Sequence, residues 1–342
     1  MRQLTAKGPN QVEWVEVPDP ELTSPKAAML RPVAVGVCDF DRGLVSGRYS
    51  TLPFPIALGH EIVAQVVETG AEVKTLRQGQ HVILPLHISC GECAPCTGGH
   101  TNSCDARKPL SNYGLGAAGG NWGGGMSDLL VVPYADAMAV PMPEGFTPAD
   151  CAALGCNLVD LHRTMQPHLQ AFPDPHVLIV SGHAGNMALY GVVMARALGI
   201  RKIDFLDDDE RRLQAAASLG ATTVRMGQPL RKEGYPIVVD CGADPERLAI
   251  ALASVAKDGV CTPVWPYPGT AAVPIGQMFR KNVTLITGQP HARAHMDPVL
   301  RLMAKHGFGS KSIPVEVLPW DSADQLFGRG EVKRIFVRDS LP

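Results

Sequence analysis

The spacing of hydrophobic residues differs between the two parts of the chain. The first part is rich in short apolar runs separated by turns, such as EIVAQVVETG at 61–70 and QHVILPL at 80–86. Short runs rich in β-branched residues and bounded by glycine or proline are typical of strands. This pattern predicts an irregular, β-barrel-like domain.

From residue 177 onward, apolar runs alternate with amphipathic stretches. The segment VLIVSGHAGNMALYGVVMARALGI, 177–200, indicates a buried strand, a glycine turn and a helix. Further apolar runs follow at 221–226, 236–243, 259–265 and 282–288, and a helical stretch is expected over 245–259. Alternation of strands and helices predicts a doubly wound parallel sheet, so the fold class is α/β with two domains.

Composition limits the partners of the protein. The 342 residues are 45% hydrophobic, which is enough for a sizeable core and about two domains. The net charge is −2 and the basic residues form no run, so small molecules are favoured over nucleic acid or an anionic membrane. The start has no apolar segment after its basic residues, and 18 consecutive apolar residues occur nowhere, so we expect a cytoplasmic protein.

Four cysteines lie in the segment CGECAPCTGGHTNSC, 90–104. Their spacing is Cys90-x2-Cys93-x2-Cys96-x7-Cys104. Cytoplasmic thiols stay reduced, so this spacing favours a metal over disulfides or free thiols. Four thiolates suit a tetrahedral zinc that leaves no position for water, which makes such a zinc structural. An iron–sulfur cluster is the alternative that cysteine thiolates also hold.

This loop resembles the structural-zinc lobe of the zinc-containing medium-chain dehydrogenase/reductase family, the alcohol and polyol dehydrogenases. The resemblance covers essentially the whole chain. It implies an irregular β-barrel-like (GroES-like) catalytic domain at 1–156 and 291–342, and a dinucleotide-binding Rossmann domain at 157–290. It also implies a homodimer or homotetramer, although no sequence feature fixes the number of subunits.

A second, open metal site is predicted upstream of the loop. Cys38 in GVCDFD, with His60 and Glu61 in ALGHEIVAQ, offers the ligand types of a catalytic zinc. The family resemblance implies Cys38, His60 and Cys156 as ligands, with Glu61 beside the metal and able to enter its coordination sphere. Whether Glu61 or Cys156 completes the sphere stays open.

The sequence departs from the family pattern just after Cys38. Many relatives carry Ser or Thr two residues later, where the hydroxyl passes on the substrate proton, but here Phe40 occupies that position. Asp160 and water are the candidate substitutes. Asp39 stands where relatives often have Gly or Arg, and its carboxylate would be a poor neighbour for a pyrophosphate if this loop lies close to one. The candidate pocket residues are Phe40, Phe54, His60, Tyr113, Trp122 and Asp160.

The predicted cofactor site begins at the turn Gly182-x-x-Gly185-x-x-Ala188, an incomplete dinucleotide-binding motif. The next strand ends at Asp207, where an acidic group meets the adenosine ribose and repels a 2′-phosphate, so we expect NAD(H) rather than NADP(H). The predicted cofactor-binding residues are Val180, Gly182, His183, Ala184, Gly185, Asn186, Met187, Asp207, Cys241 and Gly242.

Together these features predict a zinc-dependent oxidoreductase that transfers hydride between NAD(H) and an alcohol or carbonyl substrate. We expect two zinc ions per chain, one structural and one catalytic. The predicted catalytic residues are Cys38, His60, Glu61, Cys156 and Asp160. Two alternatives remain at this stage: a specialised biosynthetic reductase on the same fold, and a catalytically inactive protein that binds zinc and a dinucleotide. Phe40 favours both.

Overall fold

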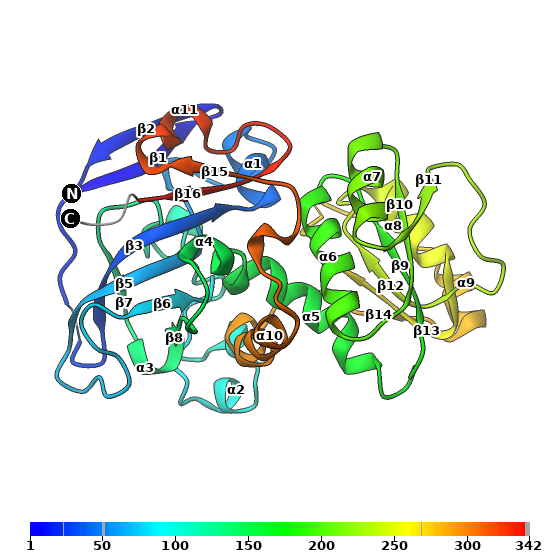
Figure 1. Ribbon diagram of the computed structural model, residues 1–342, viewed down its shortest axis with the longest axis horizontal. Coiled ribbons are helices and arrows are strands. Elements are labelled where there is room, and N and C mark those ends of the chain that lie inside the picture. Colours follow the sequence, from blue (N-terminus) through cyan, green and yellow to red (C-terminus); the bar gives the residue numbers. More distant parts are fainter. Residues whose placement is uncertain (23, 50–51, 268, 339–342) are drawn as a thin grey trace. The chain divides into compact units, whose positions relative to one another are not determined.

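The structure is a computed structural model that describes residues 1–22, 24–49, 52–267 and 269–338. The chain divides into two compact units (Figure 1). Unit 1 comprises Met1–Val159 and His291–Pro342, of which residues 339–342 lie outside the described part, and unit 2 comprises Asp160–Pro290. None of the helices formed by the described residues has the length and apolar character needed to cross a membrane.

Unit 1 is built mainly from strands. They are β1 (Arg2–Gly8), β2 (Gln11–Glu16), β3 (Ala28–Val37), β4 (Ile56–Ala57), β5 (Glu61–Thr69), β6 (His81–Leu84), β7 (Leu130–Val132), β8 (Val140–Pro141), β15 (Val315–Pro319) and β16 (Lys333–Val337). Its helices are α1 (Asp39–Val45), α2 (Ala94–Thr97), α3 (Ala135–Met138), α4 (Pro148–Cys151), the π-helix η3 (Leu154–Leu158), α10 (Ala292–His306) and α11 (Ala323–Leu326).

The larger sheet of unit 1 contains strands from both of its chain segments. Its strand order is β15-β16-β3-β5-β6-β8, with β7 paired to β3, and a smaller sheet has the order β2-β1-β4. Strand β16, red in Figure 1, runs antiparallel to the blue strand β3, and Arg334 pairs with Val37. This pairing places Lys333, at the start of β16, next to the end of β3, where Cys38 is the N-cap of helix α1.

Burial explains why these strands form one core. Strand β3 is buried along almost its whole length, as expected for a central strand covered on both faces. Leu30 of β3 packs in one cluster with Ile62 of β5 and Leu84 of β6, all three with no exposed surface. The irregular β-rich first domain predicted from the sequence is thereby confirmed.

Unit 2 is a parallel sheet with helices packed against it. Its strands are β9 (His176–Val180), β10 (Lys202–Asp207), β11 (Thr222–Arg225), β12 (Tyr235–Asp240), β13 (Val255–Pro263) and β14 (Thr284–Leu285). Its helices are α5 (Val159–Met165), which starts at the last residue of unit 1's first segment, α6 (Gly185–Ala197), α7 (Glu210–Ser218), α8 (Pro245–Ala253) and α9 (Ile275–Lys281).

The strand order of unit 2 is β11-β10-β9-β12-β13-β14, and every pair is parallel. This is the order of a doubly wound dinucleotide-binding fold, so the predicted α/β class is confirmed. The helix expected over 245–259 is too long: α8 ends at Ala253, because Val255 joins the sheet beside Tyr235.

The strand order reverses between β9 and β12, and ligands of such sheets bind outside the carboxyl ends of the strands at this point. The carboxyl ends are Val180 of β9, Asp207 of β10 and Asp240 of β12. In unit 2 the predicted cofactor residues therefore lie along the carboxyl edge of the sheet.

Candidate zinc and dinucleotide sites

The four cysteines of the loop 90–104 converge. One ligand atom from each of Cys90, Cys93, Cys96 and Cys104 lies within 4.8 Å of the others. The backbone N–H of Cys93 donates to Sγ of Cys90 at 3.4 Å, and that of Cys90 donates to Sγ of Cys104 at 3.3 Å. N–H donors stabilise thiolates, and four sulfurs at this separation fit a structural zinc.

The acid–base properties of this loop fit a metal site. A backbone hydrogen bond from Cys96 lowers the pKa of Cys93 to about 6, although burial opposes the shift. Burial raises the pKa of Cys104 and of Cys96 instead. Since the thiolate is the form that binds metal, Cys93 is ready to bind at neutral pH, and the other two must release protons as metal enters.

A second group contains Cys38, His60 and Cys156, whose ligand atoms also lie within 4.8 Å of one another. All three are buried. Cys38 precedes helix α1, His60 precedes strand β5, and Cys156 lies in the π-helix η3. Two sulfurs and one imidazole leave the fourth position of a tetrahedral zinc for water or substrate, as in catalytic sites.

Asp41 orients two members of this group. Its Oδ2 accepts a hydrogen bond from the backbone N–H of Cys38 at 2.9 Å, and its Oδ1 lies 3.1 Å from Nδ1 of His60. Because the carboxylate faces Nδ1, Nε2 is the ring nitrogen that would meet a metal, an arrangement common around metal-bound histidines. Burial lowers the pKa of His60, but Asp41 and Cys38 together outweigh burial and leave that pKa raised.

The two thiols of the group titrate in opposite directions. A hydrogen bond from Cys156 holds the pKa of Cys38 well below its ordinary value, against burial, and His60 adds to the effect. The same hydrogen bond, with burial, raises the pKa of Cys156. One thiolate therefore forms before metal enters, and the second forms as metal displaces its proton.

Glu61 faces a lysine. Both side chains of the Glu61–Lys333 pair are completely buried, and Nζ of Lys333 lies 2.5 Å from Oε2 of Glu61. Burial raises the pKa of Glu61 to about 7, although Lys333 opposes this shift. Glu61 lies outside the three-residue group, so its entry into a coordination sphere stays a prediction. A Cβ on Gly36 would lie 2.1 Å from Oε2 of Glu61, so only glycine leaves room there.

Two residues near this group were not predicted from the sequence. Nδ2 of Asn157 lies 3.2 Å from Sγ of Cys38 and 3.4 Å from Sγ of Cys156, and Nζ of Lys333 donates to Oδ1 of Asn157 at 3.0 Å. Asn157 could have been found from the sequence, because it directly follows the predicted ligand Cys156. Lys333 is 272 residues from Glu61, and no local pattern marks it.

The other residues predicted around the catalytic site have different surroundings. Phe40 stacks on Tyr49, with ring centroids 4.7 Å apart. Tyr113 is fully buried and its hydroxyl donates to the carbonyl of Val131, so it lies in the core of unit 1. Asp160 belongs to unit 2, where its carboxylate pairs with Arg163. Its role in proton transfer stays a prediction.

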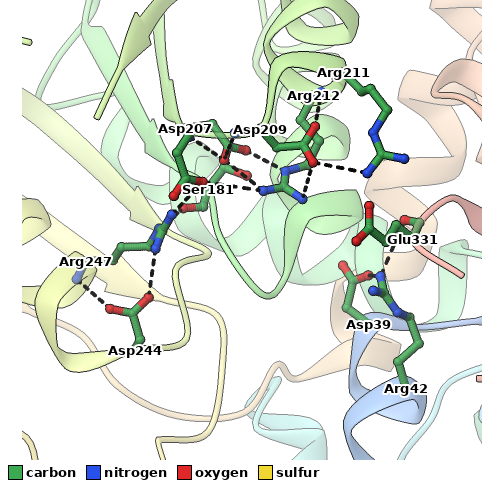
Figure 2. A network of polar contacts seen from close by, with 11 residues as sticks. Asp39, Arg42, Ser181, Asp207, Asp209, Arg211, Arg212, Asp244, Arg247 and Glu331 are labelled. Carbon is green, nitrogen blue, oxygen red and sulfur yellow. Dashed lines mark hydrogen bonds and ion pairs between the residues drawn. The ribbon is translucent and has the colours of Figure 1, made fainter. Parts of the chain in front are cut away.

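Asp39 has a basic partner within unit 1. Its Oδ1 lies 3.2 Å from Nη1 of Arg42, which also donates to the backbone oxygen of Glu331 (Figure 2). The side chain of Asp39 is completely buried. Its charge is therefore offset by a neighbour three residues along helix α1.

In unit 2, two turns are joined at the carboxyl edge of the sheet. The N–H groups of His183 and Ala184 donate to the carbonyl oxygens of Gly242 and Cys241 at 3.0 and 3.2 Å. A Cβ on Gly182 would lie 2.6 Å from the oxygen of Gly242, so this close approach requires glycine. Helix α6 starts at Gly185, and its first turn includes Asn186 and Met187, where helix amides suit a phosphate.

Asp207 is held by a bidentate ion pair. Nε and Nη2 of Arg212 lie 2.6 and 2.8 Å from its two carboxylate oxygens (Figure 2). Burial alone would raise the pKa of Asp207, but the hydrogen bonds from Arg212 hold it at about 2. Arg247 pairs with Asp208 at 2.9 Å and donates to the backbone oxygen of Ser181 at 2.7 Å. Asp207 is thus ionised at neutral pH and paired with Arg212.

Known proteins resemble this chain in sequence and fold. Residues 24–144 match the alcohol dehydrogenase GroES-like domain family. The glutathione-independent formaldehyde dehydrogenase of Bacillus subtilis is 31% identical over 353 residues, which cover 90% of this chain and 86% of that protein. The protein of the same name from Pseudomonas aeruginosa is 30% identical over 259 residues. This match covers 71% of the present chain and 64% of the length of the Pseudomonas protein. A solved structure, alcohol dehydrogenase TADH from Thermus sp. ATN1, has a TM-score of 0.88 at 28% identity and covers 99% of this chain.

A GroES-like unit with two cysteine-containing ligand groups, together with a doubly wound unit, defines the class of zinc-type alcohol dehydrogenases. The chain belongs to the zinc-containing medium-chain dehydrogenase/reductase family, as its resemblance predicted.

Proposed function

We propose that the protein is a zinc-dependent oxidoreductase that transfers hydride between NAD(H) and an alcohol or carbonyl substrate. In this proposal, unit 1 binds zinc, unit 2 binds the dinucleotide, and each chain holds about two zinc ions. The observation that carries the proposal is the buried convergence of Cys38, His60 and Cys156. Such an open donor set is typical of catalytic zinc.

The chemistry follows from the donor set and its surroundings. When bound, zinc supplies a Lewis acid for the oxygen of the alcohol or carbonyl, and the nicotinamide exchanges hydride with the substrate carbon. Asp41 holds the ring of His60 through Nδ1. Phe40 has no hydroxyl to carry the substrate proton, so we assign that transfer to Asp160 or to water.

NAD(H) is the proposed cofactor because Asp207 stands where the ribose hydroxyls are expected and is ionised at neutral pH. Titration of NADH and NADPH by fluorescence tests this. We expect wild type to bind NADH more tightly, and Asp207→Ser to reduce or reverse the preference. Asp209→Ser is the matched control, because a serine can still cap helix α7 and the preference should not change. Tighter binding of NADPH by wild type would contradict the assignment.

Simple alcohols and aldehydes are the proposed substrates, since the similar proteins are named for formaldehyde and alcohol. A screen with formaldehyde, primary and aromatic alcohols and polyols tests this with both cofactors. Cys38→Ala should abolish turnover, whereas Cys151→Ser, which changes a buried cysteine outside both ligand groups, should retain it. Equal activity of the two variants would contradict a catalytic role for Cys38.

We also propose that the protein is a cytoplasmic homodimer or homotetramer. Ile275 and Phe279 of helix α9 are 69% and 84% exposed, and apolar side chains with such exposure favour contact with a second copy. Phe279→Asp should lower the mass measured by light scattering. An unchanged mass would exclude α9 from the interface. The nine cysteines of the described structure are all free, which suits a reducing compartment.

A further inference from the structure

We propose that Asn157 is a positioning residue for the metal group of unit 1, where its amide donates to both thiolates, and that Lys333 sets the orientation of this amide. The inference rests on the proposed function, because it requires a metal at Cys38, His60 and Cys156. It concerns the environment of the sulfurs and does not make Asn157 a ligand.

The amide nitrogen of Asn157 faces two sulfurs of this group. Nδ2 carries two N–H donors, and it lies 3.2 Å from Sγ of Cys38 and 3.4 Å from Sγ of Cys156. Both distances are within the range of hydrogen bonds to sulfur. Asn157 has no exposed surface, so no solvent competes for these donors. A single side chain therefore bridges two sulfurs that come from different elements.

Lys333 determines which end of the amide faces the sulfurs. An ammonium group has donors only, and Nζ of Lys333 lies 3.0 Å from Oδ1 of Asn157. If the amide were reversed, two donors would face each other and the sulfurs would face an oxygen. Nζ also donates to Glu61, and both partners of that pair are fully buried. Glu61, Lys333 and Asn157 thus form a chain that ends at the two thiolates.

The local backbone brings Asn157 to this position. Cys156 and Asn157 are neighbours in the π-helix η3, and π-helical turns often mark functional sites. The turn is held just beyond the end of strand β6, where the N–H of Leu86 donates to the carbonyl of Gly155 at 3.1 Å. This contact fixes the segment that supplies both a predicted ligand and the residue that donates to it.

Hydrogen bonds to thiolates have two effects on a bound metal. They draw electron density from sulfur, which leaves the metal a stronger Lewis acid, and they hold the sulfur atoms in place. They also offset the repulsion between two neighbouring thiolates. Asn157 is therefore expected to influence both the affinity of the site and the energy of sulfur-to-metal charge transfer.

The experiment compares zinc and cobalt(II) binding by full-length wild type, Asn157→Leu, Cys38→Ala and Ser310→Ala. The difference between the cobalt spectra of wild type and Cys38→Ala isolates the three-residue site from the four-cysteine loop. Ser310→Ala is the matched control. It removes two hydrogen bonds of the Ser310 hydroxyl, from Ala153 N–H at 2.8 Å and to the carbonyl of Asp150 at 3.0 Å, and both of these partners are backbone groups rather than sulfurs. Metal bound by the four-cysteine loop shows that each variant has a folded unit 1.

In Asn157→Leu we expect zinc at the three-residue site to bind about 10- to 100-fold more weakly in chelator competition. The thiolate-to-cobalt charge-transfer band should move to longer wavelength, since the sulfurs lose their donors. Ser310→Ala should keep the wild-type band. If Asn157→Leu keeps both the wild-type affinity and the wild-type band, the inference is wrong.

A second variant tests the inference if Asn157→Leu does not fold. Lys333→Met with Glu61→Gln removes the buried ion pair as a whole and deprives Oδ1 of Asn157 of its ammonium partner. The amide then loses its fixed orientation, so we expect a band shift in the same direction; an unchanged band would overturn the role of Lys333. If wild type itself binds metal only at the four-cysteine loop, the proposed function fails and this inference fails with it.

Discussion

Nζ of Lys333 lies 2.5 Å from Oε2 of Glu61, and neither side chain has any exposed surface. Removing one partner of a buried ion pair leaves an uncompensated charge, which typically costs about 3–5 kcal/mol. Lys333→Met should therefore lower the free energy of unfolding of unit 1 by about that amount, measured in urea with zinc held constant.

The double variant Lys333→Met/Glu61→Gln removes both charges, whereas Lys333→Met leaves the charge of Glu61 without a partner. Comparing the two shows whether the unpaired charge causes the loss of stability. Replacing a buried pair by neutral groups of similar size is often close to neutral. We expect the double variant to recover most of the stability lost by Lys333→Met. If the double variant is as unstable as the single one, the ion pair is not the cause of the loss.

Gly155→Ala should destabilise unit 1 and weaken zinc binding at Cys156. A Cβ at this position would lie 1.9 Å from the carbonyl oxygen of Leu84, so strand β6 or the π-helix η3 must move. Overpacking of this kind costs about 1–3 kcal/mol or more. Urea unfolding and zinc content measure the two effects.

Gly276→Ala is the control for this substitution. Gly276 lies in helix α9, and the nearest atom to an added Cβ is the flexible end of Arg280 at 3.8 Å. Alanine favours the helix, so stability should rise by about 0.4–1 kcal/mol. Equal losses in Gly155→Ala and Gly276→Ala would contradict the steric argument.

The ion pair between Asp207 and Arg212 makes the stability of unit 2 depend on pH. The pKa of Asp207 is about 2 in the folded protein, below the ordinary value of 3.8. A carboxyl group with a lowered pKa in the folded state adds about 2 kcal/mol to the free energy of unfolding. This contribution is fully present above about pH 4 and is lost as the pH falls toward 2. Arg212→Met should lose this contribution at pH 7 and show a smaller difference from wild type near pH 3.

Arg211→Met is the control for that titration. Arg211 is largely exposed and lies 3.2 Å from Asp209, so its removal should change stability by less than about 1 kcal/mol. Urea unfolding of the three proteins from pH 3 to pH 8 gives the comparison. A difference between wild type and Arg212→Met that does not vary with pH would show that the pair does not act through the charge of Asp207.

How much of the site follows from the sequence depends on how local each signal is. The four-cysteine spacing is contained in 15 residues, and the structure brings all four sulfurs together. Cys156 was recognisable only through the family pattern, since nothing local distinguishes it from the buried Cys151. Lys333 could not be found, because β16 reaches the end of β3 only through tertiary pairing. Arg212 was detectable in principle, as it lies five residues after Asp207 and on the helix that follows.

Chelation should affect the two metal groups differently. The four-cysteine loop has no open position, whereas the group of Cys38, His60 and Cys156 has one, through which a chelator can bind. A chelator should therefore abolish activity with a small change in melting temperature before it removes the metal of the loop. Cys104→Ser should instead lower the melting temperature, because structural zinc contributes to folding. Simultaneous loss of both metals would contradict this order.

Metal content per chain shows most directly whether unit 1 binds a second zinc at Cys38, His60 and Cys156. Zinc should be measured on freshly purified wild type and Cys38→Ala, with Cys151→Ser as the matched control. We expect about two zinc ions in wild type and in Cys151→Ser, and about one in Cys38→Ala. One zinc ion in all three proteins would mean that only the four-cysteine loop binds metal, and zinc-assisted hydride transfer would have to be abandoned.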